Sequence, residues 1–406
     1  MKMRRIVVVG NGIAGLTACD SLRAEGFDGE LTVIGAETHQ PYSRPALSKA
    51  LLQVNADLTA HELPAPTHGA AELLGHSAAG LDVERRILRL DGGAELPWDG
   101  LVIASGSRAR RLAQDQPGRR NEPDPQGRDS REGPCSELTL RTIEDAVELR
   151  QRVAGRPSVI VIGGGPLGME VASGCLQAGC EVTLVADAPP LSRQLGEYLS
   201  GIFTAAAAAK GLRIVLGGRV RIARSASCTR VLLADGSALE AELVISAVGD
   251  APNVDWLTGS GLLADGQLRT DSRTRLRPNI VAAGDVASFP TRRGPLRVPL
   301  WTSAIDSAKA AAAGLLKGDE APELDLSPYF WTEGFGLSLK AAGFTPVSGA
   351  PDYTEPGKAD GSMLLRWNSG SGGGTAVALN YRIPVPKLRR LAVGTEVQRP
   401  VVLSGS

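Results

Sequence analysis

The sequence is poor in the residues that build metal and dithiol centres. Its four histidines all fall within residues 39–76, and none of its cysteines forms a C-x-x-C pair. No group of cysteines and histidines has the spacing of zinc ligands, which excludes a zinc ribbon and a paired-cysteine redox centre. The five cysteines are Cys19, Cys135, Cys175, Cys180 and Cys228.

The chain also lacks an excess of charge and any long apolar run. Lys and Arg total 44 and Asp and Glu total 44, so net charge cannot hold the protein to nucleic acid or anionic lipid. No apolar stretch reaches the roughly 18 residues of a membrane span. The basic start MKMRR is followed only by the apolar run 6–9, too short for a signal peptide. We therefore expect a soluble cytoplasmic protein, whose 406 residues suggest two or three domains.

The sequence contains one pattern of residues that occurs twice. An apolar β-branched run enters a Gly-rich turn, GNGIAG in the first copy and GGGPLG in the second. A helical stretch and a second apolar strand follow in each copy. The first copy has strands at 5–9 and 30–34 with a helix from 16 to about 25. The second has strands at 158–162 and 180–185 with a helix from 169 to about 178.

The two copies also end alike. Asp91-Gly92 and Asp235-Gly236 each mark a β-hairpin, followed by a closing strand at 101–106 or 243–249 that ends in glycine. Buried Val/Ile runs next to helical segments are typical of parallel sheets. We therefore predict an α/β fold with two Rossmann-like dinucleotide-binding units.

The spacing of the glycines predicts phosphate binding in both copies. The first glycine makes the tight turn, the second admits a pyrophosphate, and the third lets helix and strand pack closely. The phosphates would lie at a helix N-terminus, where free N–H groups favour anions. Two such sites imply two dinucleotides, or one site and a duplicated remnant. FAD with NAD(P)H is the natural pair, because hydride passes between them.

The first unit is the predicted FAD site. Only this unit is followed by PYSRPALSK, whose Arg44 and Lys49 could reach phosphate and the isoalloxazine. We divide the FAD domain into residues 1–111 and 250–322, and the second part contains a short strand that ends at Gly284-Asp285. The NAD(P) domain spans 138–249. Residues 112–137, rich in Pro, Gly and charge, are predicted to form a mobile loop or linker. Shorter β-like runs predict a small α+β domain over 323–406.

These motifs resemble a known family. GNGIAG, PYSRPALSK, LVIASGSRARRL, LRTIEDAVELR, VIVIGGGPLGMEVA, VAAGDVASF and PYFWTEGFGL are similar to segments of the FAD-dependent ferredoxin reductases. That family, of which putidaredoxin reductase is one example, belongs to the glutathione reductase structural class and serves bacterial haem monooxygenases and Rieske dioxygenases. The resemblance covers nearly the whole chain.

The resemblance implies roles for individual residues. Lys49 would lie near flavin N5, and Glu170 would face it beside the nicotinamide, so these two are the candidate catalytic residues. Asp285 would accept hydrogen bonds from the ribityl hydroxyls, and Trp301 would border the pyrimidine edge. A cation at N5 stabilises negative charge on the reduced flavin. Arg44 and Arg141 would contact the FAD phosphates or adenosine, and Ala78 would border the adenine. The other implied cofactor-binding residues are Gly10, Gly12, Ala14, Gly15, Glu37, Gly163, Gly165, Leu167, Gly168, Asp187, Gly249 and Gly284.

Some positions depart from the family pattern. The acids expected to hold each ribose, Glu37 and Asp187, come one residue later than usual. A shift of one residue turns a strand side chain to the other face. No arginine adjoins Asp187, which favours NADH over NADPH. Pro299 stands where relatives usually have Glu, and Ser303 replaces Asn. WTEGF also replaces WSDQY, so the acceptor side matches less well than the flavin side.

Three functions fit these observations. The first is a reductase that takes hydride from NAD(P)H onto FAD and passes electrons to a [2Fe–2S] ferredoxin partner, which serves a monooxygenase or dioxygenase. The second is a flavin oxidoreductase that acts directly on a small molecule. The third is a redox-sensing interaction protein like apoptosis-inducing factor. The sequence is compatible with a monomer or a homodimer.

Overall fold

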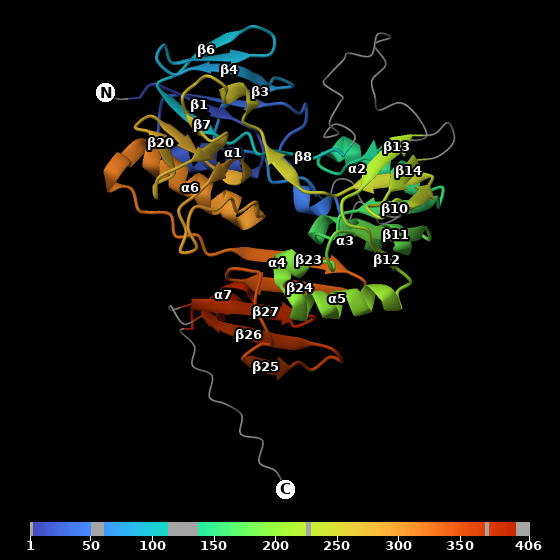
Figure 1. The fold of residues 1–406 in the computed structure, drawn as a ribbon. Coiled ribbons are helices and arrows are strands. Elements are labelled where there is room, and N and C mark those ends of the chain that lie inside the picture. The colour runs from blue at the N-terminus through green and yellow to red at the C-terminus, as the bar shows by residue number, and fades with distance from the viewer. Residues whose placement is uncertain (1–2, 50–60, 113–136, 225–228, 370–372, 395–406) are drawn as a thin grey trace.

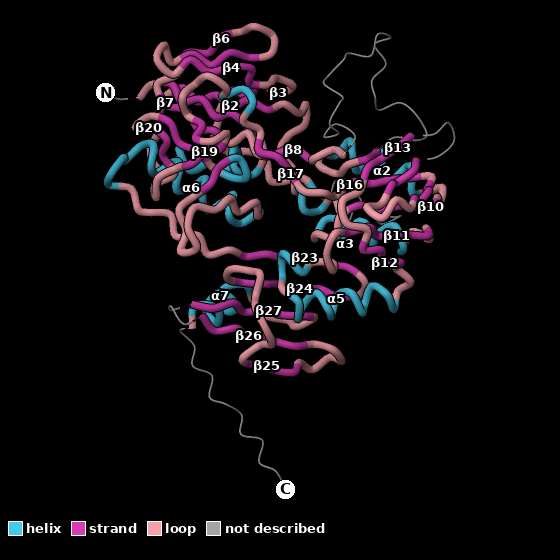
Figure 2. The backbone as a smooth tube through the Cα atoms, in the orientation of Figure 1, coloured by secondary structure: helices cyan, strands magenta, loops and turns pink. Residues whose placement is uncertain are grey.

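A computed structural model describes residues 3–49, 61–112, 137–224, 229–369 and 373–394. Cys135, Cys228 and nearly all of the predicted linker at 112–137 lie outside this part. The described residues form two α/β units and a third unit built on an antiparallel sheet (Figure 1). Figure 2 shows the same arrangement as helix and strand segments. The helices are α1 (Ile13–Ala24), α2 (Ile143–Val153), α3 (Pro166–Gln177), α4 (Ser192–Leu195), α5 (Glu197–Ala209), α6 (Trp301–Lys317) and α7 (Val385–Val393).

The first unit is a six-stranded sheet in the order β20-β21-β7-β1-β2-β3. Both of its faces are covered. Ile6 and Val8 pack under helices α1 and α6, whereas Val7 and Val9 face the antiparallel sheet β4-β5-β6. Burial on both faces explains the unbroken apolar run in the first strand. The strands are β1 (Arg5–Val9), β2 (Glu30–Gly35), β3 (Ala71–Leu74), β4 (Ala78–Asp82), β5 (Ile87–Leu90), β6 (Glu95–Pro97), β7 (Gly100–Ile103), β20 (Arg275–Arg277) and β21 (Ile280–Ala282).

The second unit repeats this plan with five parallel strands in the order β12-β11-β10-β16-β9. The hydrogen bonds at the two Gly-rich turns repeat closely. Gly10 N donates to Ile34 O and Gly163 N donates to Val185 O, both at 2.8 Å. The strands are β9 (Glu137–Leu138), β10 (Ser158–Ile162), β11 (Glu181–Ala186), β12 (Arg213–Leu216) and β16 (Leu243–Ser246), with the antiparallel sheet β13 (Arg221–Arg224), β14 (Thr229–Leu232) and β15 (Ala238–Ala241) beside them.

A two-stranded antiparallel ribbon connects the two units. Strand β8 (Ser107–Ala109) leaves the first unit and β17 (Asp250–Pro252) returns from the second. Arg297 binds Asp250 there through both guanidinium nitrogens, at 2.6 and 2.7 Å, and donates to the Asp285 carbonyl at 3.1 Å. A small sheet of β18 (Leu263–Ala264), β19 (Gln267–Arg269) and β22 (Ala287–Ser288) follows.

The C-terminal unit is an antiparallel sheet in the order β23-β24-β27-β26-β25, with α7 packed on it. Its strands share a core cluster with the second unit, in which Leu339 and Leu365 lie with Met169 and Leu199. The sheet β23–β27 and α7 therefore form a small C-terminal α+β unit, as the sequence predicted. The strands are β23 (Tyr329–Gly334), β24 (Leu337–Ala342), β25 (Tyr353–Pro356), β26 (Met363–Ser369) and β27 (Gly373–Leu379).

The α/β fold class and the internal duplication predicted from the sequence are confirmed. Helices α1 and α3 begin three residues earlier than predicted, directly after Gly12 and Gly165. The Gly-rich turn passes straight into each helix, and Pro166 suits the first helical position. Within the described residues, no helix is long and apolar enough to cross a membrane.

Candidate functional site

A cavity of about 780 Å³ opens at the carboxyl end of the first sheet. Its wall begins at the first Gly-rich turn and continues along residues 34–49. The second unit contributes Leu167 and Glu170, and the C-terminal unit contributes Tyr329, Phe330 and Trp331. All three units therefore meet at this one cavity, whose size is in the range of about 300–1,000 Å³ typical of cofactor sites.

The first Gly-rich turn is shaped for close approach of a ligand. A Cβ on Gly10 would lie 2.1 Å from Ala104 O, and one on Gly15 would lie 1.8 Å from Gly10 O. Around Gly12, by contrast, a Cβ would meet nothing within 4 Å. Gly12 caps α1 without a side-chain hydrogen bond, and the first turn of α1 holds no acid. The N–H groups of α1 are therefore free for an anion.

An unsatisfied polar side chain supports the same conclusion. Asn11 lines the cavity, and its buried amide N and O have no hydrogen-bond partner among the residues that the structure describes. Buried polar groups in folded proteins are almost always paired, so these atoms point to a polar ligand. The turn and Asn11 together fit the phosphates of a dinucleotide.

The second Gly-rich turn has the same geometry on β10 and α3. Gly163 has a φ of +112°, and a Cβ there would lie 2.3 Å from Ala247 O. A Cβ on Gly168 would lie 1.9 Å from Gly163 O. At Gly165 the nearest atom would be Gln194 Nε2, at 3.8 Å. Gly165 caps α3 without a side-chain bond, so this turn also leaves N–H groups free for an anion.

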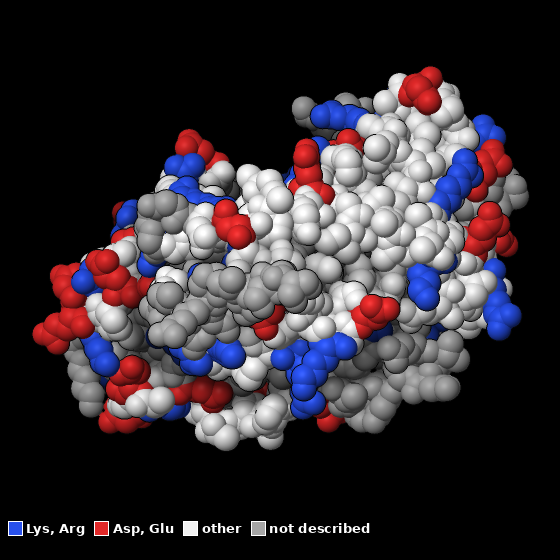
Figure 3. All heavy atoms as spheres, turned by 90° about the horizontal axis from the view of Figure 1, so that it is seen from below, with Lys and Arg blue, Asp and Glu red and all other residues white. Residues whose placement is uncertain are grey.

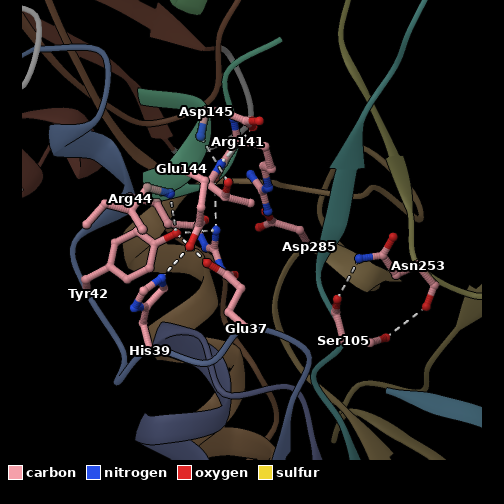
Figure 4. Close-up of polar contacts among 12 residues, drawn as sticks. Glu37, His39, Tyr42, Arg44, Ser105, Arg141, Glu144, Asp145, Asn253 and Asp285 are labelled. Carbon is pink, nitrogen blue, oxygen red and sulfur yellow. Dashed lines mark hydrogen bonds and ion pairs between the residues drawn. The ribbon is translucent and has the colours of Figure 1, made fainter. Parts of the chain in front are cut away.

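A cluster of ion pairs lies along one side of the cavity (Figure 4). Arg44 pairs with Glu37, and Tyr42 Oη donates to the other oxygen of Glu37 at 2.6 Å. Arg44 Nη1 also donates to the Arg141 carbonyl at 2.9 Å. Burial alone would lower the pKa of Arg44, but the charge and hydrogen bond of Glu37, together with Tyr42 and Asp285, outweigh burial and raise this pKa. Burial raises the pKa of Tyr42, which therefore stays protonated.

Arg141 comes to the cavity from the segment before α2. Its Nη2 lies 3.3 Å from Asp285 Oδ2, at the strand end that the sequence singled out. Its backbone N donates to Asp145 Oδ2 at 2.8 Å, within the capping box that Thr142 and Asp145 form at α2. The cap thus holds the backbone of Arg141 in place. Figure 4 shows this guanidinium between Asp285 and the Arg44 cluster.

Lys49 and Glu170 meet at another part of the cavity wall. Lys49 Nζ lies 2.9 Å from Glu170 Oε1 and 3.0 Å from Oε2, so the ammonium bridges both oxygens. Glu170 is 6% exposed and belongs to α3, one and a half turns after the second Gly-rich turn. The Lys49 ammonium also lies 5.7 Å from the centre of the Trp331 ring. A charged pair at this depth, in a cavity that fits a cofactor, is a candidate for chemistry.

The structure separates the predicted site residues into two groups. Those that line the cavity are Gly10, Gly12, Ala14, Glu37, Arg44, Lys49, Ala78, Arg141, Leu167, Glu170, Gly284, Asp285 and Trp301. Gly15 lies behind it, packed against the turn. The others, Gly163, Gly165, Gly168, Asp187 and Gly249, do not line it and belong to the second unit.

The expectations about Glu37 and Asp187, the two acids that come one residue later than usual, need correction. Glu37 lies beyond the end of β2, so strand alternation does not turn it away, and its side chain lines the cavity. No basic residue adjoins Asp187 in the sequence, but the folded chain brings one next to it. Arg193 Nη1 lies 2.9 Å from Asp187 Oδ2, because the chain folds back after Pro190.

Sequence reasoning also missed several residues at the site. Asn11 stands between the motif glycines, which drew attention away from its side chain. Ser48 Oγ donates to Glu170 Oε2, and Thr332 Oγ1 donates to Oε1 at 2.7 Å. No spacing in the sequence connects Thr332 with Glu170, since the two residues belong to different units.

Metal-ligating and thiol side chains do not form a further site within the described residues. The described residues contain no group of three or more His, Cys, Asp or Glu side chains placed to hold a metal. Cys19 and Cys175 are buried, and this burial raises the pKa of each thiol to about 12. On the face shown in Figure 3, basic and acidic side chains are interspersed, with uncharged areas between them.

Comparison with known proteins agrees with this site. Residues 4–312 match the model of the pyridine nucleotide-disulphide oxidoreductase family. The chain is 33% identical, over 89% of its length and 85% of the relative's, to the ferredoxin reductase component of chlorobenzene dioxygenase from Cupriavidus sp. strain PS12. It is 32% identical to the ferredoxin–NAD(+) reductase component of the p-cumate 2,3-dioxygenase system from Pseudomonas putida, over 84% and 81% of the two chains.

A solved structure shows the same architecture. The reductase in the covalent putidaredoxin reductase–putidaredoxin complex superposes with a TM-score of 0.81 at 26% identity. The superposition covers 96% of this chain and 93% of that one. The chain therefore belongs to the pyridine nucleotide-disulphide oxidoreductase family, among its ferredoxin reductases.

Proposed function

We propose that this protein is an FAD-dependent NADH:ferredoxin oxidoreductase that delivers electrons to a [2Fe–2S] ferredoxin of an oxygenase system. One observation carries the proposal. Helix α3 begins at the second Gly-rich turn, and its Glu170 reaches the cavity of the first. A nicotinamide dinucleotide held at the start of α3 would therefore extend toward the cofactor in the first cavity.

The named relatives support the same assignment. Both curated relatives are ferredoxin reductase components of dioxygenase systems, and one is named for NAD(+). The putidaredoxin reductase structure was solved with its ferredoxin-type partner bound covalently. We infer that this chain uses a partner of the same class.

The residues of the first cavity suit FAD. Asn11 and the N-terminus of α1 would hold the pyrophosphate, with Arg44 and Arg141 as nearby cations. Glu37 and Asp285 would accept from ribose and ribityl hydroxyls, and Ala78 would border the adenine. When bound, FAD supplies the step from two-electron hydride chemistry to single-electron transfer.

The residues at the other end of the cavity would control the reactive ring system of the FAD. Lys49 presents a cation that favours negative charge on the ring system, and Glu170 holds that cation in place. Trp301 and Trp331 line the same cavity and would shield the bound ring system from water. We propose the domain division 1–111 with 250–322 for FAD, 138–249 for NAD(P), and 323–406 for the C-terminal domain.

A second candidate activity follows from the cavity's apolar edge. Pro299, Phe330 and Trp331 line the cavity, and the family resemblance implies a Glu at the position of Pro299. Such an edge suits direct reduction of a small aromatic acceptor without a ferredoxin.

Purification and turnover test the proposal. We expect a yellow protein with one FAD per chain. It should reduce ferricyanide and a small [2Fe–2S] ferredoxin with NADH, and cytochrome c only when that ferredoxin is present. A colourless protein that cannot be reconstituted with FAD contradicts the proposal. Rapid turnover with small aromatic acceptors and none with ferredoxin supports the second candidate instead.

A further inference from the structure

The Glu170 carboxylate accepts a hydrogen bond from the C-terminal unit in addition to its ion pair with Lys49. Oε1 accepts from Thr332 Oγ1 at 2.7 Å and Oε2 accepts from Ser48 Oγ. Lys49 Nζ bridges the two oxygens between these hydroxyls. Each oxygen therefore receives one hydroxyl and a share of the ammonium, which fixes the plane of the carboxylate as well as its position.

The Thr332 hydroxyl is placed to affect Glu170 strongly. Thr332 is 1% exposed and Glu170 is 6% exposed, so water does not compete for either group. A hydrogen bond to a buried charge is worth more than one between neutral groups. Thr332 belongs to β23, in a different sheet from the one that α3 flanks. The C-terminal unit therefore reaches the carboxylate of this pair through the Thr332 hydroxyl, while its Trp331 ring lies beside the Lys49 ammonium.

We propose that Thr332 is a positioning residue that acts through Glu170 to tune the flavin site. The inference rests on the proposed function. The hydroxyl disperses the negative charge of Glu170 and keeps the carboxylate against Lys49. Without it, more of that negative charge would face the flavin, and Lys49 would be held less firmly. Reduced flavin would then be less stable and would form more slowly.

A second contact between the same two elements offers a matched control. Phe335 N, just beyond β23, donates to Ser173 Oγ on α3 at 2.9 Å. Ser173 is 4% exposed and lies three residues after Glu170, but it has no contact with Glu170 or Lys49 among the described hydrogen bonds. Ser173→Ala thus weakens the attachment of β23 to α3 without removing a donor from the carboxylate.

The experiment compares Thr332→Val, Thr332→Ser and Ser173→Ala with the wild type, each loaded with FAD. The midpoint potential of the bound flavin is measured by equilibrium titration with a redox dye. Anaerobic stopped flow measures the rate at which NADH reduces the flavin. For Thr332→Val we expect a lower potential and a reduction rate about three- to tenfold lower, less than the loss of a group that contacts the flavin directly. Thr332→Ser should restore both values, and Ser173→Ala should leave both unchanged.

Thermal unfolding of the FAD-free proteins separates stability from tuning. Thr332→Val and Ser173→Ala each remove a buried hydrogen bond, so both should unfold at a lower temperature than the wild type. The inference is overturned if Thr332→Val leaves the potential and the rate at wild-type values, if Ser173→Ala shifts them equally, or if Thr332→Ser fails to restore them. A wild-type protein that binds no FAD, or whose FAD is not reduced by NADH, would instead refute the proposed function.

Discussion

Arg193 and Asp187 form an ion pair at the end of β11, with 2.9 Å between Nη1 and Oδ2. The chain returns on itself to bring them together. Leu191 adopts a left-handed φ of +63°, and its N donates to Gly164 O at 2.7 Å. The segment 189–195 therefore folds back toward the second Gly-rich turn and places the Arg193 cation beside Asp187, the residue predicted to hold the adenosine ribose.

This pair refines the expected coenzyme preference. We predict higher kcat/KM with NADH than with NADPH, because Asp187 would accept from the ribose hydroxyls and repel a 2′-phosphate. In Asp187→Ala, Arg193 is released and can bind that phosphate. The NADPH penalty should then shrink about tenfold, the value of one hydrogen bond between charged groups, and KM for NADH should rise.

Arg193→Leu is the opposite change, and steady-state kinetics with both coenzymes measure the ratio. It keeps Asp187 and removes the cation, so the NADPH penalty should grow. A wild type that prefers NADPH would show that Arg193 outweighs Asp187. Equal ratios in all three proteins would place the discrimination elsewhere.

The Asp250–Arg297 pair predicts a pH dependence of stability. Burial alone would raise the pKa of Asp250, but hydrogen bonds from Arg297 and Ser107 and the nearby arginine charges hold it below its ordinary 3.8. A carboxyl whose pKa is lower in the folded state stabilises the fold above about pH 4 and loses this contribution as pH falls further. Asp250→Asn should therefore cost about 1–3 kcal/mol at pH 7.

Thermal unfolding between pH 7 and pH 3 tests the Asp250 prediction. The difference between the wild type and Asp250→Asn should narrow toward pH 3, because the Asp250 carboxyl has the higher pKa in the unfolded chain, which therefore binds a proton first and becomes more favourable. A difference that stays constant over this range would mean that the charge of Asp250 does not contribute.

Local patterns in the sequence were sufficient to predict the two α/β units. Each depends on a strand, a Gly-rich turn and a helix that are continuous in the chain, so spacing alone identifies them. The contact of Gly15 with Gly10 O follows directly from that spacing. The pairing of Lys49 with Glu170 was reached only through resemblance to a family.

The remaining contacts depend on how separate units pack. Thr332 is 162 residues from Glu170, and no periodicity relates them. Arg193 is near Asp187 only because Leu191 takes a conformation that is unusual for a residue with a side chain. Asn11 was visible in the sequence, but only the folded structure shows that its amide has no partner among the described residues.

The two central glycines predict a reciprocal pair of variants. Gly12 and Gly165 have negative φ values and room for a Cβ, so substitution at either position should leave the fold intact. Gly12→Glu would put a carboxylate where the first phosphates bind and should abolish FAD binding. Gly165→Glu should retain FAD but block reduction by NADH.

Visible absorption and stopped-flow reduction distinguish these variants. Gly15→Ala is the control for damage to the fold, since its Cβ would lie 1.8 Å from Gly10 O, and it should be unstable rather than selectively defective. If Gly12→Glu kept its flavin and Gly165→Glu lost it, the assignment of the two units would have to be exchanged.

Lys49 should matter more for the reaction than for holding FAD. Lys49→Met keeps most of the side-chain volume but removes the charge next to Glu170, so we expect FAD to remain bound. Loss of one preorganised charge costs about 10²–10³ in rate, and flavin reduction by NADH should slow by that amount. The variant also leaves Glu170 buried without its cation, and Ser48 and Thr332 are then the donors that remain to it among the described residues. For this reason Lys49→Met/Glu170→Gln is the necessary comparison, because it removes both charges and avoids an unpaired buried carboxylate. If the double variant is as stable as the wild type but still slow, the missing cation is responsible. If the Lys49→Met protein holds FAD and its flavin is reduced at the wild-type rate, Lys49 is only an ion-pair partner of Glu170 and takes no part in the reaction.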